Sequence, residues 1–175
     1  MNRDNQQERS KQNIKVPERI GWYFAGFIDG EGSFNISLRK KSDYKQQWQP
    51  VLSFNVSQRE KTVLTLMQHY FQCGIIKKRK DGLHSFDITN PIEIQEKIIP
   101  FFTKYNFLSS NKNHNFKLFK KAVKIMYKKE HLNKDGLIKL LEIRENLNQG
   151  KGRTRKYSIN DVLESSETTR QTSHK

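Results

Sequence analysis

The chain has 175 residues, of which 33 are Lys or Arg and 18 are Asp or Glu, so its formal net charge is +15. This length fits one domain with a substantial core, and such a surplus of positive charge is typical of proteins that bind a polyanion: DNA, RNA or an anionic membrane. The single cysteine, Cys73, excludes an intramolecular disulfide and a zinc site built from cysteines. No apolar run is long enough to span a bilayer and no signal-peptide pattern is visible. We therefore expect an intracellular protein, in the cytoplasm or nucleoid of a prokaryote or inside an organelle.

One folded domain is expected over residues 16–165. Disordered tails are expected at 1–15 and 166–175, where apolar side chains are scarce. The C-terminal part of the domain, residues 130–165, is expected to hold helices and a basic loop.

Helical and strand-like patterns follow one another along the chain. The first helix is expected to begin near Pro17 and to end at Asp29, because proline suits a first helical position and Gly30 suits the position after a helix. Apolar and polar residues alternate over 34–39 and 51–57, which predicts two strands with one buried and one open face. The remaining expected elements are a helix at 60–72, a hairpin that turns at Asp81-Gly82, helices at 91–104, 112–129 and 134–147, and a short helix that Ser158 or Asn160 caps.

This order, α-β-β-α-β-β-α with additional helices, predicts an α+β fold. The sheet would be four-stranded and antiparallel, with helices covering one face. The uncovered face would present Asn, Ser, Arg, Lys and Gln side chains. A polar, basic and open sheet face is more often than not a binding surface.

Two acids, Asp29 and Glu31, lie at the C-terminal end of the first helix, where the helix dipole disfavours negative charge by a few tenths to about 1 kcal/mol. A bound cation would offset this cost, and so would solvation at an unimportant position. The flanking glycines favour the cation, because they let a partner approach closely. Small residues on the same helix also allow a second helix to pack at short range: Gly21, Ala25, Gly26 and Gly30.

The stretch FAGFIDGEG at residues 24–32 resembles the LAGLIDADG motif of the homing endonuclease family. Ala25, Gly26, Ile28, Asp29 and Gly32 are identical to the motif. The substituted positions are Phe24, Phe27, Gly30 and Glu31. The order of the elements that follow is also that of the family, so the resemblance extends over residues 16–130. Residues 147–165 resemble the C-terminal loop and helix of single-motif members encoded in ribosomal RNA introns.

The resemblance implies an αββαββα LAGLIDADG fold with a saddle-shaped sheet, and a site-specific endonuclease that cuts both DNA strands and leaves short 3′ overhangs. One motif per chain implies a homodimer and a target of roughly 20 bp with approximate two-fold symmetry, expected in a ribosomal RNA gene. In this family two motif helices pack side by side, which would place these residues at the dimer interface: Gly21, Phe24, Ala25, Gly26, Ile28 and Asp29. Asp29 would order the helix end rather than bind metal.

The same resemblance implies the catalytic residues and the cofactor. The two copies of Glu31 would hold Mg²⁺, with the Gly30 carbonyl as an additional ligand, and the metal would activate water and stabilise the leaving oxygen. Mn²⁺ would substitute for Mg²⁺, and Ca²⁺ would bind without supporting cleavage. Gln58 would lie near the metal-bound water, and Lys112 would stabilise phosphate charge.

The saddle would lie in the major groove of double-stranded DNA, with open-face side chains contacting bases or phosphates. The first pair of strands and its loop would contribute Asn35, Ser37, Arg39, Lys41, Tyr44, Gln49, Val51, Ser53 and Asn55. The second hairpin would contribute Ser85 and Asp87, together with Lys78 and Lys80 from the basic run 77–80, whose phase is ambiguous. Phosphate contacts are also expected from the C-terminal basic segment, through Lys151, Arg153, Arg155 and Lys156.

Three other functions remain open on these residues. They are a catalytically silent DNA-binding protein on the same fold, an intron maturase that binds RNA, and a basic structural protein of the ribosome. The presence of Glu31 argues against a silent copy, and a structural protein would need no acid pair at a helix end. The aromatic residues fall on the buried phase of the strands, which favours duplex DNA over RNA, although intron RNA stays a possible partner.

Overall fold

The computed structural model describes residues 15–41, 47–149 and 155–162. Most of the predicted disordered tails therefore lies outside the described residues. The chain forms α1 (Glu18–Glu31), β1 (Gly32–Lys40), β2 (Trp48–Gln58), α2 (Thr62–Phe71), β3 (Ile75–Lys78), β4 (His84–Ile88), α3 (Pro91–Glu93), η1 (Ile94–Ile98), α4 (Ile99–Lys104), α5 (Ser110–Tyr127), η2 (Glu130–Leu132) and α6 (Lys134–Asn146). Among these elements no helix is both long and apolar enough to cross a membrane.

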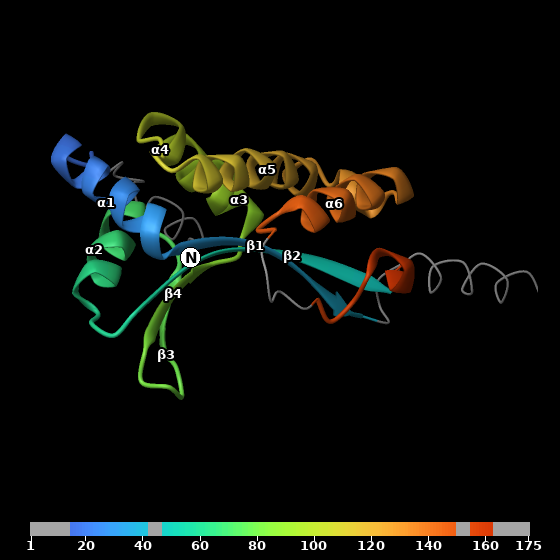
Figure 1. Cartoon of the computed structure of the whole chain (residues 1–175), viewed down its shortest axis with the longest axis horizontal. Coiled ribbons are helices and arrows are strands. Elements are labelled where there is room, and N and C mark those ends of the chain that lie inside the picture. The colour runs from blue at the N-terminus through green and yellow to red at the C-terminus, as the bar shows by residue number, and fades with distance from the viewer. Residues whose placement is uncertain (1–14, 42–46, 150–154, 163–175) are drawn as a thin grey trace, which may run out of the picture.

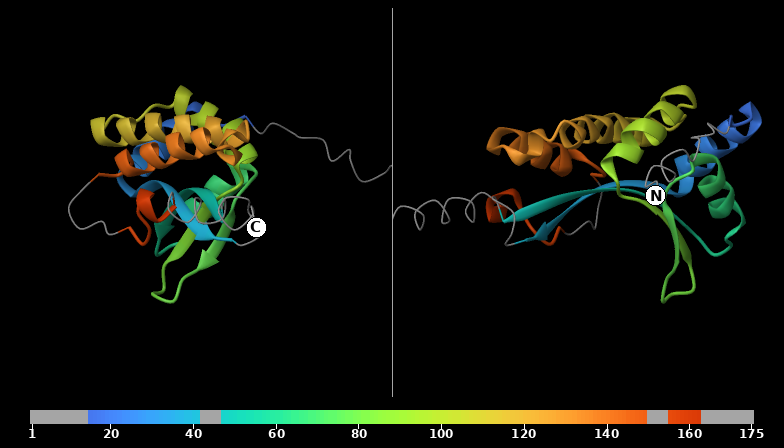
Figure 2. Two further views of the ribbon diagram at one scale, coloured as in Figure 1. Left: turned by 90° about the vertical axis from the view of Figure 1, so that its right-hand side faces the viewer. Right: turned by 180° about the vertical axis from the view of Figure 1, so that it is seen from behind.

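The four strands form one antiparallel sheet in the order β1-β2-β4-β3, as predicted. The helices α3 to α6 lie over one face of this sheet (Figure 1). The β3–β4 hairpin bends away from the helix layer, so that the uncovered face is concave (Figures 1 and 2). The predicted α+β saddle fold is confirmed.

The core lies between the sheet and the helices and is rich in phenylalanine. Three strands each contribute one inward-facing phenylalanine that is at most 1% exposed: Phe34 of β1, Phe54 of β2 and Phe86 of β4. Phe34 packs against Phe119 of α5, with ring centroids 5.0 Å apart. Each buried aromatic ring removes about 150–250 Å² from water, so this cluster makes a large contribution to the stability of the domain.

The first helix is longer than predicted. It continues through Gly30 and ends at Glu31, where the backbone N–H of Gly32 donates to the Ile28 carbonyl. Gly32 has extended dihedral angles (φ −78°, ψ 154°), so the chain passes from helix into strand with no left-handed residue. The prediction that the helix ends at Asp29 with Gly30 as the residue after it is wrong, and both Asp29 and Glu31 belong to the last helical turn.

The helical region at 91–104 has a π-helical turn in its middle, at Ile94–Ile98. It begins where the Asn90 side chain accepts a hydrogen bond from the Ile92 backbone N–H at 2.9 Å. The following helix, α5, starts two residues earlier than predicted because Ser109 is its N-cap. Near the C-terminus, the Ser158 hydroxyl accepts from the Asp161 backbone N–H at 3.2 Å and caps the short helix there, as predicted.

Candidate functional site

The C-terminal end of α1 is fastened to the N-terminal end of α5 by Asp29. One carboxylate oxygen of Asp29 accepts hydrogen bonds from the backbone N–H groups of Leu108 (3.2 Å) and Ser109 (2.9 Å), and the other accepts from the Ser109 hydroxyl. Burial raises the pKa of Asp29. These hydrogen bonds and the charge of Lys112 lower the pKa by a larger amount, so it lies below its ordinary value. Asp29 thus joins the last turn of α1 to the N-cap of α5.

Lys112 lies in the first turn of α5, beside the two acids of α1. Its ammonium group donates to the carbonyl of Gly32, and its side chain is half-buried. Burial lowers the pKa of Lys112, while the negative charges of Asp29 and Glu31 oppose that change. The structure therefore brings Lys112 together with Glu31, although the two residues are far apart in the sequence.

Gln58 is the last residue of β2 and lies at the same end of the sheet. Gly32, the first residue of β1, pairs with Val56, so Gln58 extends two residues beyond the start of β1, alongside the turn from α1. On its other side Gln58 pairs with His84 of β4. This register places an amide side chain near the end of α1, where Glu31 lies.

The residues present are suited to a hard divalent cation. The side chain of Glu31 and the backbone of Gly30 are exposed at the end of α1, and carboxylate and carbonyl oxygens are the ligands that Mg²⁺ prefers. The described residues contain no cluster of three or more acidic, His or Cys side chains that could hold a metal. Because Asp29 is already engaged with α5, one protomer offers a single exposed carboxylate at this end of the helix.

The face of α1 assigned to a dimer interface needs correction. Phe24 and Ile28 are 0% exposed and Ala25 is 3% exposed, because this face packs into the core of the protomer itself. Gly21 is also buried, and a Cβ atom there would collide with the ring of Tyr105. The assignment is therefore wrong for these four residues, and among the six assigned positions Gly26 alone lies on the exposed face.

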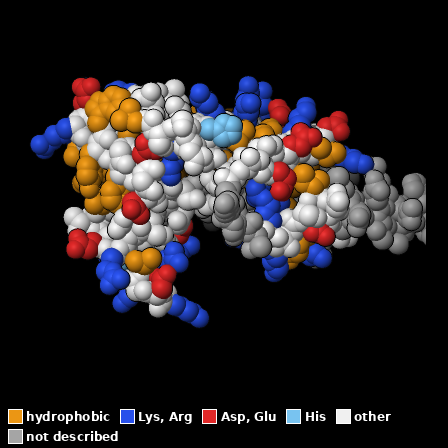
Figure 3. All heavy atoms as spheres, in the orientation of Figure 1, with side chains coloured by type: hydrophobic (Ala, Val, Ile, Leu, Met, Phe, Trp, Pro, Cys, Tyr) orange, Lys and Arg blue, Asp and Glu red, His pale blue; other side chains and the backbone are white. Residues whose placement is uncertain are grey.

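The exposed face of α1 combines glycines with aromatic residues. A Cβ atom added at Gly26 or Gly30 would meet no described atom within 4 Å. Tyr23 is 47% exposed and Phe27 is half-buried beside them. Hydrophobic side chains gather on the side of the molecule where α1 lies (Figure 3). Residues 23, 26, 27 and 30 follow the period of a helix, so they form one continuous stripe.

The concave face of the sheet carries most of the predicted contact residues. Cross-strand pairs share a face, and the pairs Asn35–Ser53 and Asn55–Asp87 lie on the face away from the core. The predicted residues that alternate on this face are Asn35, Ser37, Arg39, Gln49, Val51, Ser53, Asn55, Ser85 and Asp87. Lys41 follows directly after β1 and is exposed.

Several of these side chains are hydrogen-bonded to one another. The Asp87 carboxylate accepts from the Asn55 amide and, at 2.7 Å, from the Ser85 hydroxyl. The Ser57 hydroxyl donates to Asn55 at 3.3 Å and accepts from Arg79 at 3.4 Å. The polar groups of this face therefore hold defined orientations before any ligand arrives.

The β3–β4 register settles the phase of the basic run 77–80. Lys77 pairs with Ser85 and so faces the concave side, whereas Lys78 pairs with His84 and faces the opposite side. The assignment of Lys78 to the contact face is therefore wrong. The run 77–80 was predicted to contact DNA with its phase left open, and Lys77 rather than Lys78 lies on the concave face, which Arg79 also reaches through its bond to Ser57. No apolar residue within the basic run marks this phase.

The C-terminal basic segment is used differently from the prediction. Tyr44, Lys151 and Arg153 lie outside the described residues. The Arg155 guanidinium donates to the carbonyls of Glu145 and Leu147, both at 3.2 Å, and to the Arg144 carbonyl. It also forms an ion pair with Glu145 at 3.0 Å. Arg155 therefore caps the end of α6 and is not available as a phosphate ligand, while Lys156 is exposed.

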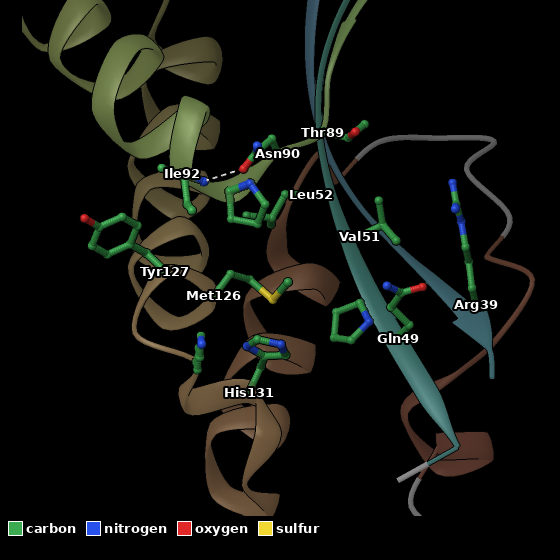
Figure 4. A pocket seen from close by; sticks show the side chains of 13 residues that line it. Arg39, Gln49, Val51, Leu52, Thr89, Asn90, Ile92, Met126, Tyr127 and His131 are labelled. Carbon is green, nitrogen blue, oxygen red and sulfur yellow. Dashed lines mark hydrogen bonds between the residues drawn. The ribbon is translucent and has the colours of Figure 1, made fainter. Parts of the chain in front are cut away.

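A cavity of about 460 Å³ lies between the outer half of β2 and the end of α5. Figure 4 shows Arg39, Gln49 and Val51 on one side of it and Met126, Tyr127 and His131 on the other. Glu31, Gln58 and Lys112 are not among the residues that line it, so it is separate from the site around Glu31.

Comparison with known proteins identifies the family of this chain. The family model described as LAGLIDADG endonuclease matches residues 24–123. A Neurospora crassa protein named probable intron-encoded endonuclease 2 is 32% identical over 145 residues, which are 81% of this chain and 32% of that protein. DNA endonuclease I-CeuI of Chlamydomonas moewusii is 28% identical, with 81% of this chain and 68% of that protein covered.

Two solved structures have similar folds. The homing endonuclease I-TnaI has a TM-score of 0.71 at 29% identity and covers 85% of this chain and 96% of its own. I-SmaMI, bound to uncleaved DNA in the presence of calcium ions, has a TM-score of 0.71 at 34% identity, with 79% of this chain and 47% of I-SmaMI covered. The chain thus spans 32% of the Neurospora protein and 47% of I-SmaMI. From the extent of the family match, we conclude that this chain belongs to the LAGLIDADG endonuclease family.

Proposed function

We propose that this chain is one subunit of a homodimeric, Mg²⁺-dependent endonuclease that cuts double-stranded DNA at a specific site. The observation that carries the proposal is the juxtaposition of Glu31 and Lys112 at the end of α1, a helix that carries the exposed Gly26 and Gly30 and leads directly into β1 of the sheet. An acid that can hold a metal, a cation that can face a phosphate and a polar groove that can hold DNA are thereby combined in one place.

A homodimer is supported by the exposed face of α1. A glycine in the interior of a helix costs about 0.5–1 kcal/mol relative to alanine, and the described protomer gives Gly26 no compensating contact. Close approach of a second copy of α1 would provide one, with Tyr23 and Phe27 packing on either side. A two-fold axis beside these helices would bring the two Glu31 carboxylates near each other. The match to 47% of I-SmaMI is in line with a chain that forms half of a complete enzyme.

The chemistry of the site follows from its residues. Glu31 from each subunit and the Gly30 carbonyl would hold Mg²⁺, which when bound lowers the pKa of water and stabilises the leaving oxygen of a phosphodiester. Gln58 would orient the attacking water through its amide group. Lys112 would stabilise the charge of the phosphate, because Asp29 and Glu31 favour its protonated form. We expect Mn²⁺ to substitute, Ca²⁺ to permit binding without cleavage, and the products to carry short 3′ overhangs.

The concave sheet face would lie in the major groove of the DNA. From Glu31 to Arg39 a strand extends roughly 27 Å, at about 3.4 Å per residue, which is the length of about eight base pairs. Two such half-sites cover about 16 bp, and the base pairs at the centre, between the two Glu31 residues, bring the target to roughly 20 bp. Arg39, Lys41 and Lys77 supply positive charge on this face or directly beside it. The described aromatic residues of the strands point into the core, which favours a duplex over stacked single-stranded bases.

The decisive test is cleavage of a plasmid library of ribosomal RNA gene segments. We expect this target class because residues 147–165 resemble the C-terminal segment of family members that are encoded in ribosomal RNA introns. Wild type should make double-strand cuts at one site with Mg²⁺ and should bind without cutting in Ca²⁺. Glu31→Gln should retain binding and lose cleavage, because it removes a metal ligand and leaves the groove intact. Glu18→Gln, an exposed acid at the other end of the same helix, is the matched control and should cut normally.

The other outcomes separate the remaining hypotheses. Binding of duplex DNA without cleavage in any metal would identify a catalytically silent DNA-binding protein. Displacement of the DNA by intron RNA at lower concentration than by duplex competitor would favour a maturase. Cleavage that persists undiminished in Glu31→Gln would reject the assignment of the active site.

A further inference from the structure

The outer half of the β1–β2 hairpin has little sheet around it. β4 pairs with β2 over Phe54–Gln58, so in the described sheet the outer residues of β2, 48–53, pair with β1 alone. The cavity of about 460 Å³ separates this ribbon from the end of α5 (Figure 4). A two-stranded ribbon is marginally stable by itself, so its position depends on what packs against its described outer end, residues 38–40 and 48–51, here called the tip.

A second hydrophobic cluster, separate from the main core, packs against that tip. Leu38 of β1 and Trp48 of β2 are buried together with Leu137 and Leu141 of α6 and with Val162. The ring of Tyr157 meets Trp48 edge-on, with centroids 4.7 Å apart. The Lys40 ammonium lies 5.4 Å from the Trp48 ring and 6.0 Å from the Tyr157 ring. The tip is therefore held between α6 and residues 155–162.

Polar contacts fasten residues 155–162 to α6. The Arg155 guanidinium caps the last carbonyls of α6 and forms an ion pair with Glu145. In return, the buried guanidinium of Arg144 donates to the Tyr157 carbonyl at 3.0 Å. The segment is thus tied in two directions, and its hydrophobic side chains are presented to the hairpin in a defined position.

We propose that residues 155–162, here called the clasp, position the hairpin tip against DNA and so determine selectivity at the outer base pairs of each half-site. The inference rests on the proposed DNA endonuclease function. Arg39 and Gln49 form a cross-strand pair on the concave face, and each is a direct chain neighbour of a clasped residue, Leu38 or Trp48. Because side chains alternate along a strand, holding one face of the ribbon fixes the direction of the side chains on the other.

Loosening the clasp would affect selectivity more than chemistry. Hydrogen bonds to base edges require defined direction, and a site that is loose by about 1 Å loses discrimination. The tip lies roughly 27 Å along the strand from Glu31, so the catalytic end of the sheet, fastened by Asp29 and the main core, would keep its geometry. The expected consequence is promiscuity confined to the ends of the target.

The test compares Val162→Ala and Tyr157→Ala with Val123→Ala. Val162 and Val123 are both 0% exposed, but Val123 lies in the main core, so it controls for an equal loss of buried volume. Cleavage rates are measured on the wild-type target and on targets with single changes at every position. Wild type should discriminate by about tenfold at the outer pairs, within the range for one mismatch. The clasp variants should fall to about twofold there and keep wild-type selectivity at the central pairs.

Amide hydrogen exchange supplies a second readout that does not require cleavage. Exchange in 38–40 and 48–51 should accelerate in both clasp variants and stay unchanged in Val123→Ala. Equal loss of activity at all target positions, or the same outer promiscuity in Val123→Ala, would overturn the positioning role. If wild type cuts no target, the proposed function fails, and the clasp is then judged on exchange alone: unaltered protection of the tip would reject it.

Discussion

Replacing Gly26 by alanine should have opposite effects on the protomer and on the dimer. In the described protomer a Cβ atom at this position meets no atom within 4 Å, so the new methyl group enters open space. Alanine is favoured over glycine in a helix interior by about 0.5–1 kcal/mol, and Gly26→Ala should raise the free energy of unfolding of the monomer by that amount. In the proposed dimer the same methyl group would enter the contact between two α1 helices.

The cost to the dimer can be estimated from overpacking. Forcing methyl groups into a well-packed interface costs about 1–3 kcal/mol, which corresponds to a roughly fivefold to hundredfold weaker dimer. The two-fold axis places a second methyl group from the partner in the same contact, so we expect the upper part of this range. Gly21→Ala is the contrasting variant, because its Cβ atom would collide with Tyr105 inside the protomer.

The assay combines sedimentation at several protein concentrations with urea denaturation at low concentration, where the protein is monomeric. This separation is needed because dimerisation itself raises the apparent stability. Gly26→Ala should unfold at higher urea and dissociate at higher protein concentration, whereas Gly21→Ala should unfold at lower urea. A dimer dissociation constant unchanged by Gly26→Ala would refute the proposed helix contact.

Three further changes test the remaining parts of the site. Asp29→Asn should lower the free energy of unfolding by about 1–2 kcal/mol at neutral pH. Because the pKa of Asp29 is lowered, this contribution is present above its ordinary value of 3.8 and disappears as the pH falls through the folded value, so denaturation near pH 3 should show a smaller difference. Lys112→Met should keep DNA binding and reduce the cleavage rate about a hundredfold, and an unchanged rate would exclude the proposed role. Because burial lowers the pKa of Lys112, the cleavage rate of the wild type should decline with rising pH below the ordinary lysine pKa of 10.5. Arg155→Gln should destabilise the protein by about 1 kcal/mol without changing the salt dependence of DNA binding. Lys156→Gln should reduce the slope of the logarithm of the binding constant against the logarithm of the salt concentration by about one. Equal slopes for the two variants would contradict the capping role of Arg155.

The strands and their buried face could be predicted because apolar and polar residues alternate along them, which leaves little doubt about which side chains face the core. Phe34, Ile36 and Leu38 point into the core, and a shift by one residue would have buried asparagine and serine instead. The phase of β3 could not be read in this way. A run of four basic residues has no apolar marker, so its faces are set by pairing with β4, which is a property of the folded sheet.

The faces of α1 show a different limit. Gly21 and Ala25 have the same spacing as Gly26 and Gly30, so spacing alone does not tell which pair faces outward. The structure buries the first pair because it shares a helical stripe with Phe24, and it leaves the second pair exposed. A stricter use of helical periodicity would have identified the buried stripe. The prediction that Arg155 contacts phosphate was wrong for a related reason. A basic run indicates positive charge, but it does not indicate which group a long side chain contacts, and Arg155 contacts the end of α6.

The two acids of the motif differ in their surroundings, because Asp29 is engaged within the chain and Glu31 is exposed, and this difference supports the proposal that two subunits form the metal site. Asp29 accepts three hydrogen bonds from the start of α5, which is what holds Lys112 beside Glu31. An acid saturated in this way is a poor metal ligand, so each chain has one exposed carboxylate at this end of α1. In the proposed dimer, the glycine face next to it would let a second copy bring in another carboxylate. Dimerisation and metal binding should therefore be coupled: Mg²⁺ should tighten the dimer of the wild type and have no such effect on Glu31→Gln.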